Sequence, residues 1–104
     1  MNIKGTLPLL ILQSVSAQPR HGYQIAQVIK QTSDGVLDFK EGTLYPTLHN
    51  LLAQGYLESF AEEENGRMRH YYRLTNSGAG LLASEQKEWQ QIVKAVNQTL
   101  EQSA

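Results

Sequence analysis

The sequence predicts a mainly α-helical fold with one β-hairpin, an α+β arrangement, on three observations. Three segments repeat apolar side chains at the spacing of an amphipathic helix, and a fourth, residues 7–15, is largely apolar. Two segments between residues 56 and 74 alternate in part between apolar and polar residues, and an Asn-Gly pair typical of a tight hairpin joins them. The length of 104 residues fits one domain with a helical extension.

The first helix is expected over residues 7–15, which are largely apolar. Thr6 is a suitable N-terminal cap, and Pro8 falls in the first turn, where a missing backbone N–H costs little. The helix should end before Pro19 and be buried on several sides.

A second helix is expected to begin at Arg20-His21-Gly22 and to run to about Thr32. Four of its apolar residues fit one helical face: Tyr23, Ile25, Ala26 and Ile29. Residues 33–35 form a turn, and residues 36–40 are either a connector or a single bridge of sheet.

The third helix is predicted over residues 42–54. It opens with Thr43, has Pro46 in its first turn, and stops at Gly55. Its apolar stripe consists of Leu44, Leu48, Leu51 and Leu52.

A β-hairpin follows, with strands at residues 56–63 and 68–74 and a turn at Glu64-Asn65-Gly66-Arg67. Three helices followed directly by a hairpin with arginines near its tip give the layout of a winged helix-turn-helix. We therefore expect residues 1–75 to form a DNA-binding domain.

The last segment, residues 76–104, is predicted to be one continuous helix capped by Thr75 or Asn76, close to 40 Å long. Its apolar stripe consists of Leu82, Trp89, Val93, Val96 and Leu100, with Ile92 beside them. A small three-helix core cannot cover such a stripe, so the helix either folds back over the first helix or pairs with a second copy of the chain. The seven-residue spacing favours pairing, which makes this segment a dimerisation helix and suits a pseudo-palindromic DNA site.

Composition excludes several other classes of protein. The net charge is −1, so phosphate binding depends on where the cations lie rather than on overall charge. There is no cysteine, the three histidines lack metal-ligand spacing, and no phosphate-binding glycine loop or activated nucleophile is evident. We therefore expect no enzyme activity, metal or cofactor. The longest apolar run, residues 9–12, cannot span a membrane, and no signal peptide is evident, so a cytoplasmic protein is expected.

Three motifs carry a family resemblance: HGYQI at residues 21–25, EGTLYPTL at residues 41–48, and Gly66-Arg67 leading to YYRLT at residues 71–75, then Gly78. In this order and spacing the chain resembles the PadR family of bacterial transcriptional regulators over nearly its whole length. The single C-terminal helix is similar to the compact subgroup of that family. The resemblance implies a homodimeric repressor that leaves its operator when a small effector binds, often a phenolic or flat compound.

The chain departs from the family pattern at the middle of the third helix, where His49 and Asn50 stand in place of a frequent basic residue. The hairpin is also less basic than in many relatives. These departures bear on DNA affinity and operator preference.

Nine residues are candidates for DNA contact: Tyr23, Gln24, Lys40, Thr43, Tyr45, Thr47, Asn50, Arg67 and Arg69. Those of the third helix are expected to face the major groove, where Asn pairs with adenine and Thr contacts several base edges. The others are expected to meet the phosphate backbone, or, for Arg67 and Arg69, either the backbone or the minor groove.

Six of these candidates have a purely structural alternative. Thr43 is then only a helix cap, Tyr45 packs on the second helix, Asn50 is an ordinary exposed residue and Tyr23 belongs to the core. Arg67 and Arg69 would pair with residues 62–64, which are all glutamates, in a solvated hairpin, and Arg73 is expected to be structural.

Trp89, the only tryptophan, is the effector candidate, because two indoles at a dimer seam can stack on a planar aromatic molecule. The family resemblance supports a tryptophan in such a pocket. Leu12, Gln86, Ile92 and Val93 are candidate walls. The alternative for Trp89 is simple packing in the dimer. For the whole chain, the alternative function is a winged-helix module that binds proteins and not DNA.

Overall fold

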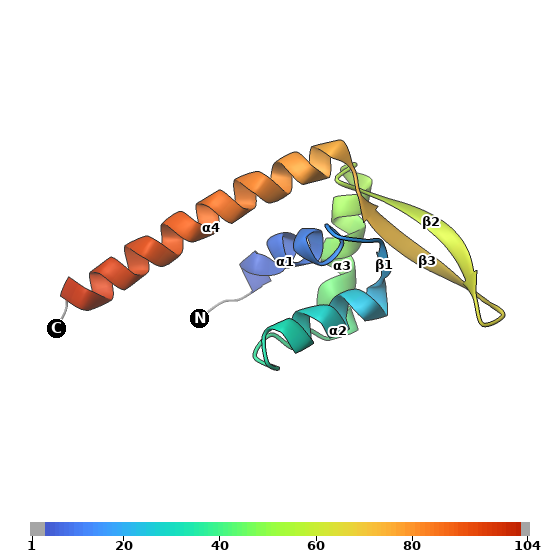
Figure 1. Ribbon diagram of the computed structural model, residues 1–104, viewed down its shortest axis with the longest axis horizontal. Helices are drawn as coiled ribbons and strands as arrows, with labels where there is room; N and C mark the ends of the chain where they lie inside the picture. Colours follow the sequence, from blue (N-terminus) through green and yellow to red (C-terminus); the bar gives the residue numbers. More distant parts are fainter. Residues whose placement is uncertain (1–3, 103–104) are drawn as a thin grey trace.

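The computed structural model describes residues 4–102 and confirms the α+β class (Figure 1). The elements are η1 (Lys4–Thr6), α1 (Leu7–Ser14), β1 (Arg20–His21), α2 (Gly22–Thr32), α3 (Glu41–Ala53), β2 (Leu57–Glu64), β3 (Arg67–Leu74) and α4 (Asn76–Gln102). This is a winged helix-turn-helix followed by a long C-terminal helix. Residues 103–104, the end of the predicted last helix, and residues 1–3 of the predicted first domain lie outside the described part of the chain.

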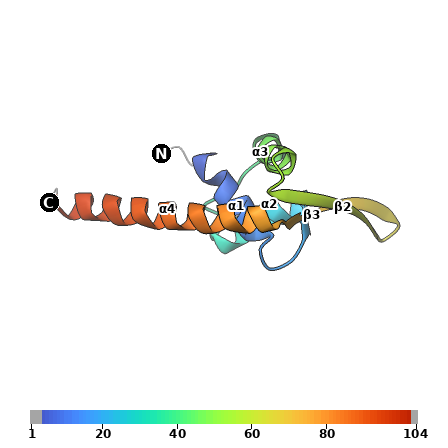
Figure 2. The same cartoon turned by 90° about the horizontal axis from the view of Figure 1, so that it is seen from above.

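The core lies where α1, α2 and α3 meet the base of the hairpin and the first turns of α4. Its buried apolar side chains are Leu7, Ile11, Leu12, Val15, Ile25, Ile29, Phe39, Leu44, Leu48, Leu51, Leu57, Tyr72 and Leu82. Burial of these side chains supplies the main driving force for folding. The hairpin and α4 extend from this core in opposite directions, while α3 projects from one side (Figure 2).

The prediction that Arg20 and His21 begin the second helix is wrong. Both residues are extended and form β1, which pairs with β3 in a sheet of order β1-β3-β2. His21 caps α2: the Gln24 backbone N–H donates to His21 Nδ1 at 3.3 Å, and the His21 N–H donates to Gln24 Oε1 at 3.1 Å. This reciprocal cap satisfies two backbone donors and fixes the start of the helix at Gly22.

The third helix begins at Glu41, so two details of the prediction are wrong. Pro46 lies inside α3, beyond its first turn, and Thr43 is a helical residue, not the cap, because Lys40 holds the N-cap position. Residues 37–40 have no regular structure and form the predicted connector. Gly55, with φ of +82°, ends the helix as predicted.

The hairpin turn is confirmed at Asn65 and Gly66, whose φ angles of +53° and +79° suit the left-handed turn that joins two twisted strands. Thr75 is confirmed as the cap of α4, since its hydroxyl oxygen accepts the Gly78 N–H at 3.0 Å.

The first half of α4 lies against the rest of the described chain, and its first turns are the most deeply packed. Near its first turns, Gly78 is buried against the Tyr56 carbonyl, and Leu82 is buried in the core. Assigning Leu82 to the dimer stripe was therefore wrong, because the protomer itself covers this side chain. The helix runs alongside α1, where Gln86 Nε2 donates to Gln13 Oε1 at 2.6 Å, and then continues past it (Figure 1).

The close approach at Gly78 gives a stability test. A Cβ added there would lie 2.0 Å from the Tyr56 carbonyl oxygen, so Gly78→Ala should lower the free energy of unfolding by about 1–3 kcal/mol. Gly80→Ala is the matched control, because a Cβ at Gly80 meets nothing within 4 Å; helix propensity should raise stability there by about 0.5–1 kcal/mol. Urea unfolding of both variants checks this, and equal stabilities would contradict the packing described for α4.

Candidate nucleic-acid interface

The exposed side of α3 carries some of the predicted groove-facing residues but not all. Thr43, Thr47 and Asn50 follow one another at steps of four and three, so they share one flank of the helix. Tyr45 is two residues from Thr43 and therefore lies on the opposite flank. Asn50 is exposed, while the two threonines and Tyr45 are half-buried.

Tyr45 packs on α2, which was the structural alternative to DNA contact for this residue. A Cβ added at Gly22 would lie 2.6 Å from the Tyr45 ring, so the ring can occupy this position on α2 only because residue 22 is glycine. Tyr45 also lines a hollow of about 230 Å³ between α2, α3 and β3. The other lining residues are His21, Gly22, Tyr23, Arg69, His70 and Tyr72.

Of the two predicted contact residues at the start of α2, Tyr23 is exposed and Gln24 takes part in the helix cap. Tyr23 is 57% exposed, so the alternative that it belongs to the core is wrong. Its ring stacks beside His21 with centroids 6.4 Å apart. The Gln24 side chain completes the cap of α2, which gives it a structural role. Lys40 is exposed at the N-terminus of α3.

The hairpin arranges its charges as a ladder on one face. Alternate residues of a strand share a face, and directly paired residues face the same side. The register pairs each hairpin arginine with a glutamate: Arg67 with Glu64, Arg69 with Glu62, and Arg73 with Glu58. The opposite face carries Met68, His70 and Tyr72, and it turns toward the helices, since Tyr72 is buried in the core.

Ion pairing differs among the three arginines. Arg73 Nε lies 2.6 Å from Glu58 Oε1, and its guanidinium carbon lies 5.0 Å from the centre of the Phe60 ring, which confirms a structural role. Arg69 Nε is 3.9 Å from Glu64 Oε2, so the paired alternative holds in part for this residue. Arg67 is exposed and forms no ion pair within residues 4–102.

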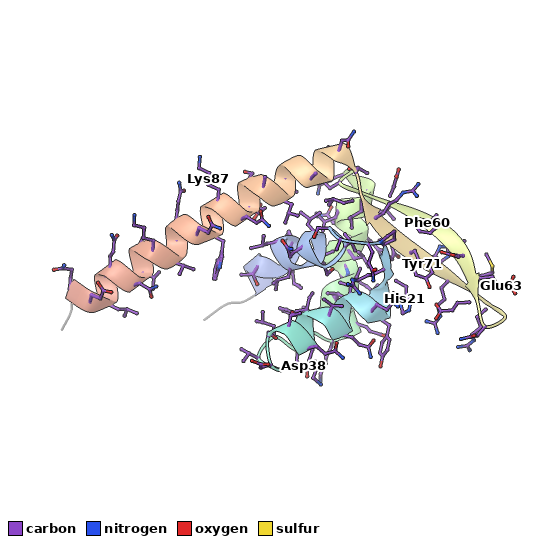
Figure 3. All side chains as sticks on the ribbon, viewed as in Figure 1. His21, Asp38, Phe60, Glu63, Tyr71 and Lys87 are labelled. Carbon is purple, nitrogen blue, oxygen red and sulfur yellow. The ribbon has the colours of Figure 1, made fainter. Side chains whose placement is uncertain are left out.

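A row of aromatic rings crosses the sheet on the same face as this ladder, and it was not predicted from the sequence. Tyr71 makes an edge contact with His21 at 5.5 Å between centroids and stacks on Phe60 at 5.7 Å (Figure 3). The Tyr71 hydroxyl donates to Glu64 Oε2 at 2.5 Å. These contacts join β1, β3 and β2, and so connect the wing to the start of α2. The hairpin register places Phe60 opposite Tyr71, and the pairing of β1 with β3, which is remote in sequence, brings His21 to the same row.

The predicted effector residues divide into two groups. Trp89, Ile92 and Val93 are exposed on α4, at 42%, 48% and 36%. Trp89 and Ile92 line a hollow of about 190 Å³ beside α1, together with Gly5, Thr6, Leu9, Glu85 and Glu88. Val93 does not line this hollow. It lines a second surface along α4, and Trp89 borders both.

Leu12 and Gln86 do not line either surface beside Trp89. Leu12 is fully buried in the core, and Gln86 is hydrogen-bonded to Gln13. The assignment of Leu12 as a pocket wall is wrong, because α1 turns this side chain into the core, whereas that of Gln86 stays a prediction. Leu9, Glu85 and Glu88 line the hollow beside α1 instead. Each lies one helical turn from a residue that was predicted as part of the site, so helical spacing in the sequence could have identified them.

Two further findings concern residues 4–102. No helix in this range is long and apolar enough to cross a membrane. Within the same range, no group of three acidic or histidine side chains could hold a metal ion.

Comparison with known proteins agrees with this geometry. A family model described as "Transcriptional regulator PadR-like family" matches residues 11–84. The structure of smu.1704 from Streptococcus mutans UA159 superposes with a TM-score of 0.85 at 38% sequence identity, covering 94% of this chain and 89% of that chain. A PadR family transcription regulator from Clostridium difficile R20291 gives a TM-score of 0.80 at 31% identity, covering 92% and 99%. Transcriptional regulator Rv3488 of Mycobacterium tuberculosis is 34% identical over 77 residues, 74% of this chain and 59% of that protein.

The capping role of His21 predicts a pH-dependent stability. Burial lowers the pKa of His21 below its usual 6.5; nearby Arg69 lowers it too, whereas Glu64 raises it. Because the folded pKa is lowered, the contribution of the neutral cap is fully present above pH 6.5. It is lost as the pH falls below 6.5 through the folded pKa, where Nδ1 becomes protonated and cannot accept the Gln24 N–H.

Urea unfolding between pH 7.5 and pH 5 measures this effect. His21→Asn is the matched variant, since Asn also caps helices and does not titrate. The wild type should lose about 0.5–2 kcal/mol more than the variant over this range. Parallel pH profiles would contradict the capping role.

Proposed function

Because the chain belongs to the PadR-like family of transcriptional regulators, we propose that it acts as a homodimeric repressor. In this proposal it binds a specific, pseudo-palindromic DNA operator and leaves it when a small planar aromatic effector binds. The observation that carries the proposal is the placement of one exposed helix face, on α3, beside an exposed tyrosine, a lysine and a hairpin with arginines. Such a surface fits a major groove and the phosphates that flank it.

DNA contact divides between base recognition and backbone binding. Asn50 and the flank formed by Thr43 and Thr47 are the base-facing side chains of α3. Tyr23 and Lys40 are suited to phosphate oxygens on either side of the groove. Arg67 and Arg69 are suited to the backbone along the wing, with Arg67 free of an ion pair in the described chain.

The apolar stripe of α4 supports dimerisation. Trp89, Val93, Val96 and Leu100 follow at steps of four, three and four, and they are exposed at 42%, 36%, 50% and 66%. An exposed apolar stripe of this length is unfavourable in water and is covered when two such helices pair. Pairing also doubles the modest basic surface and matches the two-fold symmetry of a palindromic site.

The effector proposal rests on Trp89. In the dimer proposed above, each indole would lie near its copy, and a flat aromatic molecule between them would stack on both rings. Because the same residues would form the seam and the effector site, binding would alter the distance between the two DNA-reading domains. The alternative for Trp89 is simple dimer packing.

A protein-binding role without DNA is the second candidate function. The observation in its favour is the hairpin ladder, in which a glutamate faces each arginine and removes much of the basic character of the wing. Salt-insensitive association with a protein would favour this role over DNA binding.

The wing arginines give a direct test of backbone contact. Replacing Arg67 and Arg69 together by Ala should weaken binding to every duplex and lower the slope of log affinity against log salt by about 2, one for each lost phosphate contact. Arg73→Ala is the matched control, because Arg73 is already paired with Glu58 and stacked on Phe60. If the double variant kept the affinity and slope of the control, the wing would not contact DNA.

Trp89→Ala tests the effector site. Titration with acridine, a planar aromatic probe, should show affinity reduced by about five- to a hundredfold, the range for losing one aromatic stacking partner. Trp89→Phe should recover part of the affinity. Light scattering controls for loss of the dimer, and operator binding without acridine should be retained. Unchanged acridine affinity would reduce Trp89 to a packing residue.

A further inference from the structure

The outward crest of α3 offers very few hydrogen-bonding side chains. Leu44, Leu48 and Leu51 point into the core, so the opposite side of the helix faces away from it. The exposed crest consists of Gly42, Pro46, His49, Asn50 and Ala53. Three of these five are short or lack hydrogen-bonding groups, which allows the helix backbone to lie close to a partner surface. His49 and Asn50 alone on this crest can recognise a base edge.

The His49 ring is held in place by its neighbour. Its centroid lies 5.8 Å from that of Tyr45, with the two planes at 37°. Tyr45 is itself fixed by the close approach of Gly22 at the start of α2. A side chain that is ordered before binding loses less conformational entropy when it makes a contact.

Asn50 is held in a similar way on the same crest. Its Oδ1 accepts a hydrogen bond from Gln54 Nε2 at 3.0 Å, one helical turn further along. The amide NH₂ is left for an outside acceptor. His49 and Asn50 are therefore two adjacent polar side chains, each in contact with a neighbour four residues away. The other side chains of the crest are short and apolar.

We propose that His49 is a specificity-determining residue that donates a hydrogen bond from its imidazole N–H to a purine acceptor in the major groove, N7 or guanine O6. Neutral imidazole has one donor and one acceptor, and both purine acceptors are exposed at the floor of that groove. The inference rests on the proposed DNA-binding function and assigns part of its sequence preference to a residue beside Asn50.

The experiment begins with selection of duplexes from a random pool by the wild-type protein, followed by titration of single-base-pair variants of the selected site. His49→Ala should bind the selected site about five- to tenfold more weakly and lose preference at one base pair in each half-site, because one base contact is gone. Binding to an unrelated duplex should stay unchanged. Gln91→Ala, an exposed change on α4, is the control for substitution itself.

A second variant separates base contact from a merely structural role. His49→Gln should change the preferred base at the same position toward adenine, because Gln pairs with adenine through two hydrogen bonds. If the wild type discriminates among duplexes and both His49 variants keep its preference at every position, the assignment of His49 is overturned and DNA binding stands. If the wild type shows no preference at all, the proposed function and this inference fall together.

Discussion

The contact between Tyr45 of α3 and Gly22 of α2 is the constraint on which the geometry of the interface depends. Gly22 follows His21, which caps α2 with its side chain and pairs with β3 through its backbone. One short stretch of chain therefore fixes the start of α2, the approach of α3 and the position of the wing. A side chain at Gly22 would displace the Tyr45 ring from its place on α2. The aromatic row from His21 through Tyr71 to Phe60 extends the same constraint into the hairpin.

The long helix α4 obeys a different constraint. Its first turns are packed tightly, with Gly78 against the Tyr56 carbonyl and Leu82 in the core, so its direction is set by the winged helix-turn-helix. Its remaining length carries apolar side chains that the protomer leaves exposed. In the proposed dimer, this packed link between the core and the stripe would couple the seam to both DNA-reading surfaces. A molecule that changed the seam would then change the separation of these surfaces, which two half-sites on DNA would sense.

Local patterns in the sequence predicted most of the fold. The Asn65-Gly66 turn, the stop at Gly55 and the Thr75 cap depend on residues next to them, and all three were predicted. β1 was missed, because two extended residues are stabilised by a strand about fifty positions away. The same limit applies to the site. Helical spacing identified the stripe of α4, but it could not tell that the protomer already covers Leu82 or that α1 turns Leu12 inward.

The balance of charge on the wing also depends on register, which composition does not reveal. Six charged residues of the hairpin form three facing pairs only because Glu64 lies opposite Arg67.

The central claim, sequence-specific DNA binding, is tested most directly by titrating the protein against the duplex upstream of its own gene and against a scrambled duplex, at two salt concentrations. The account predicts tighter binding to the upstream duplex that weakens as salt rises. Equal or absent binding to both duplexes would contradict it.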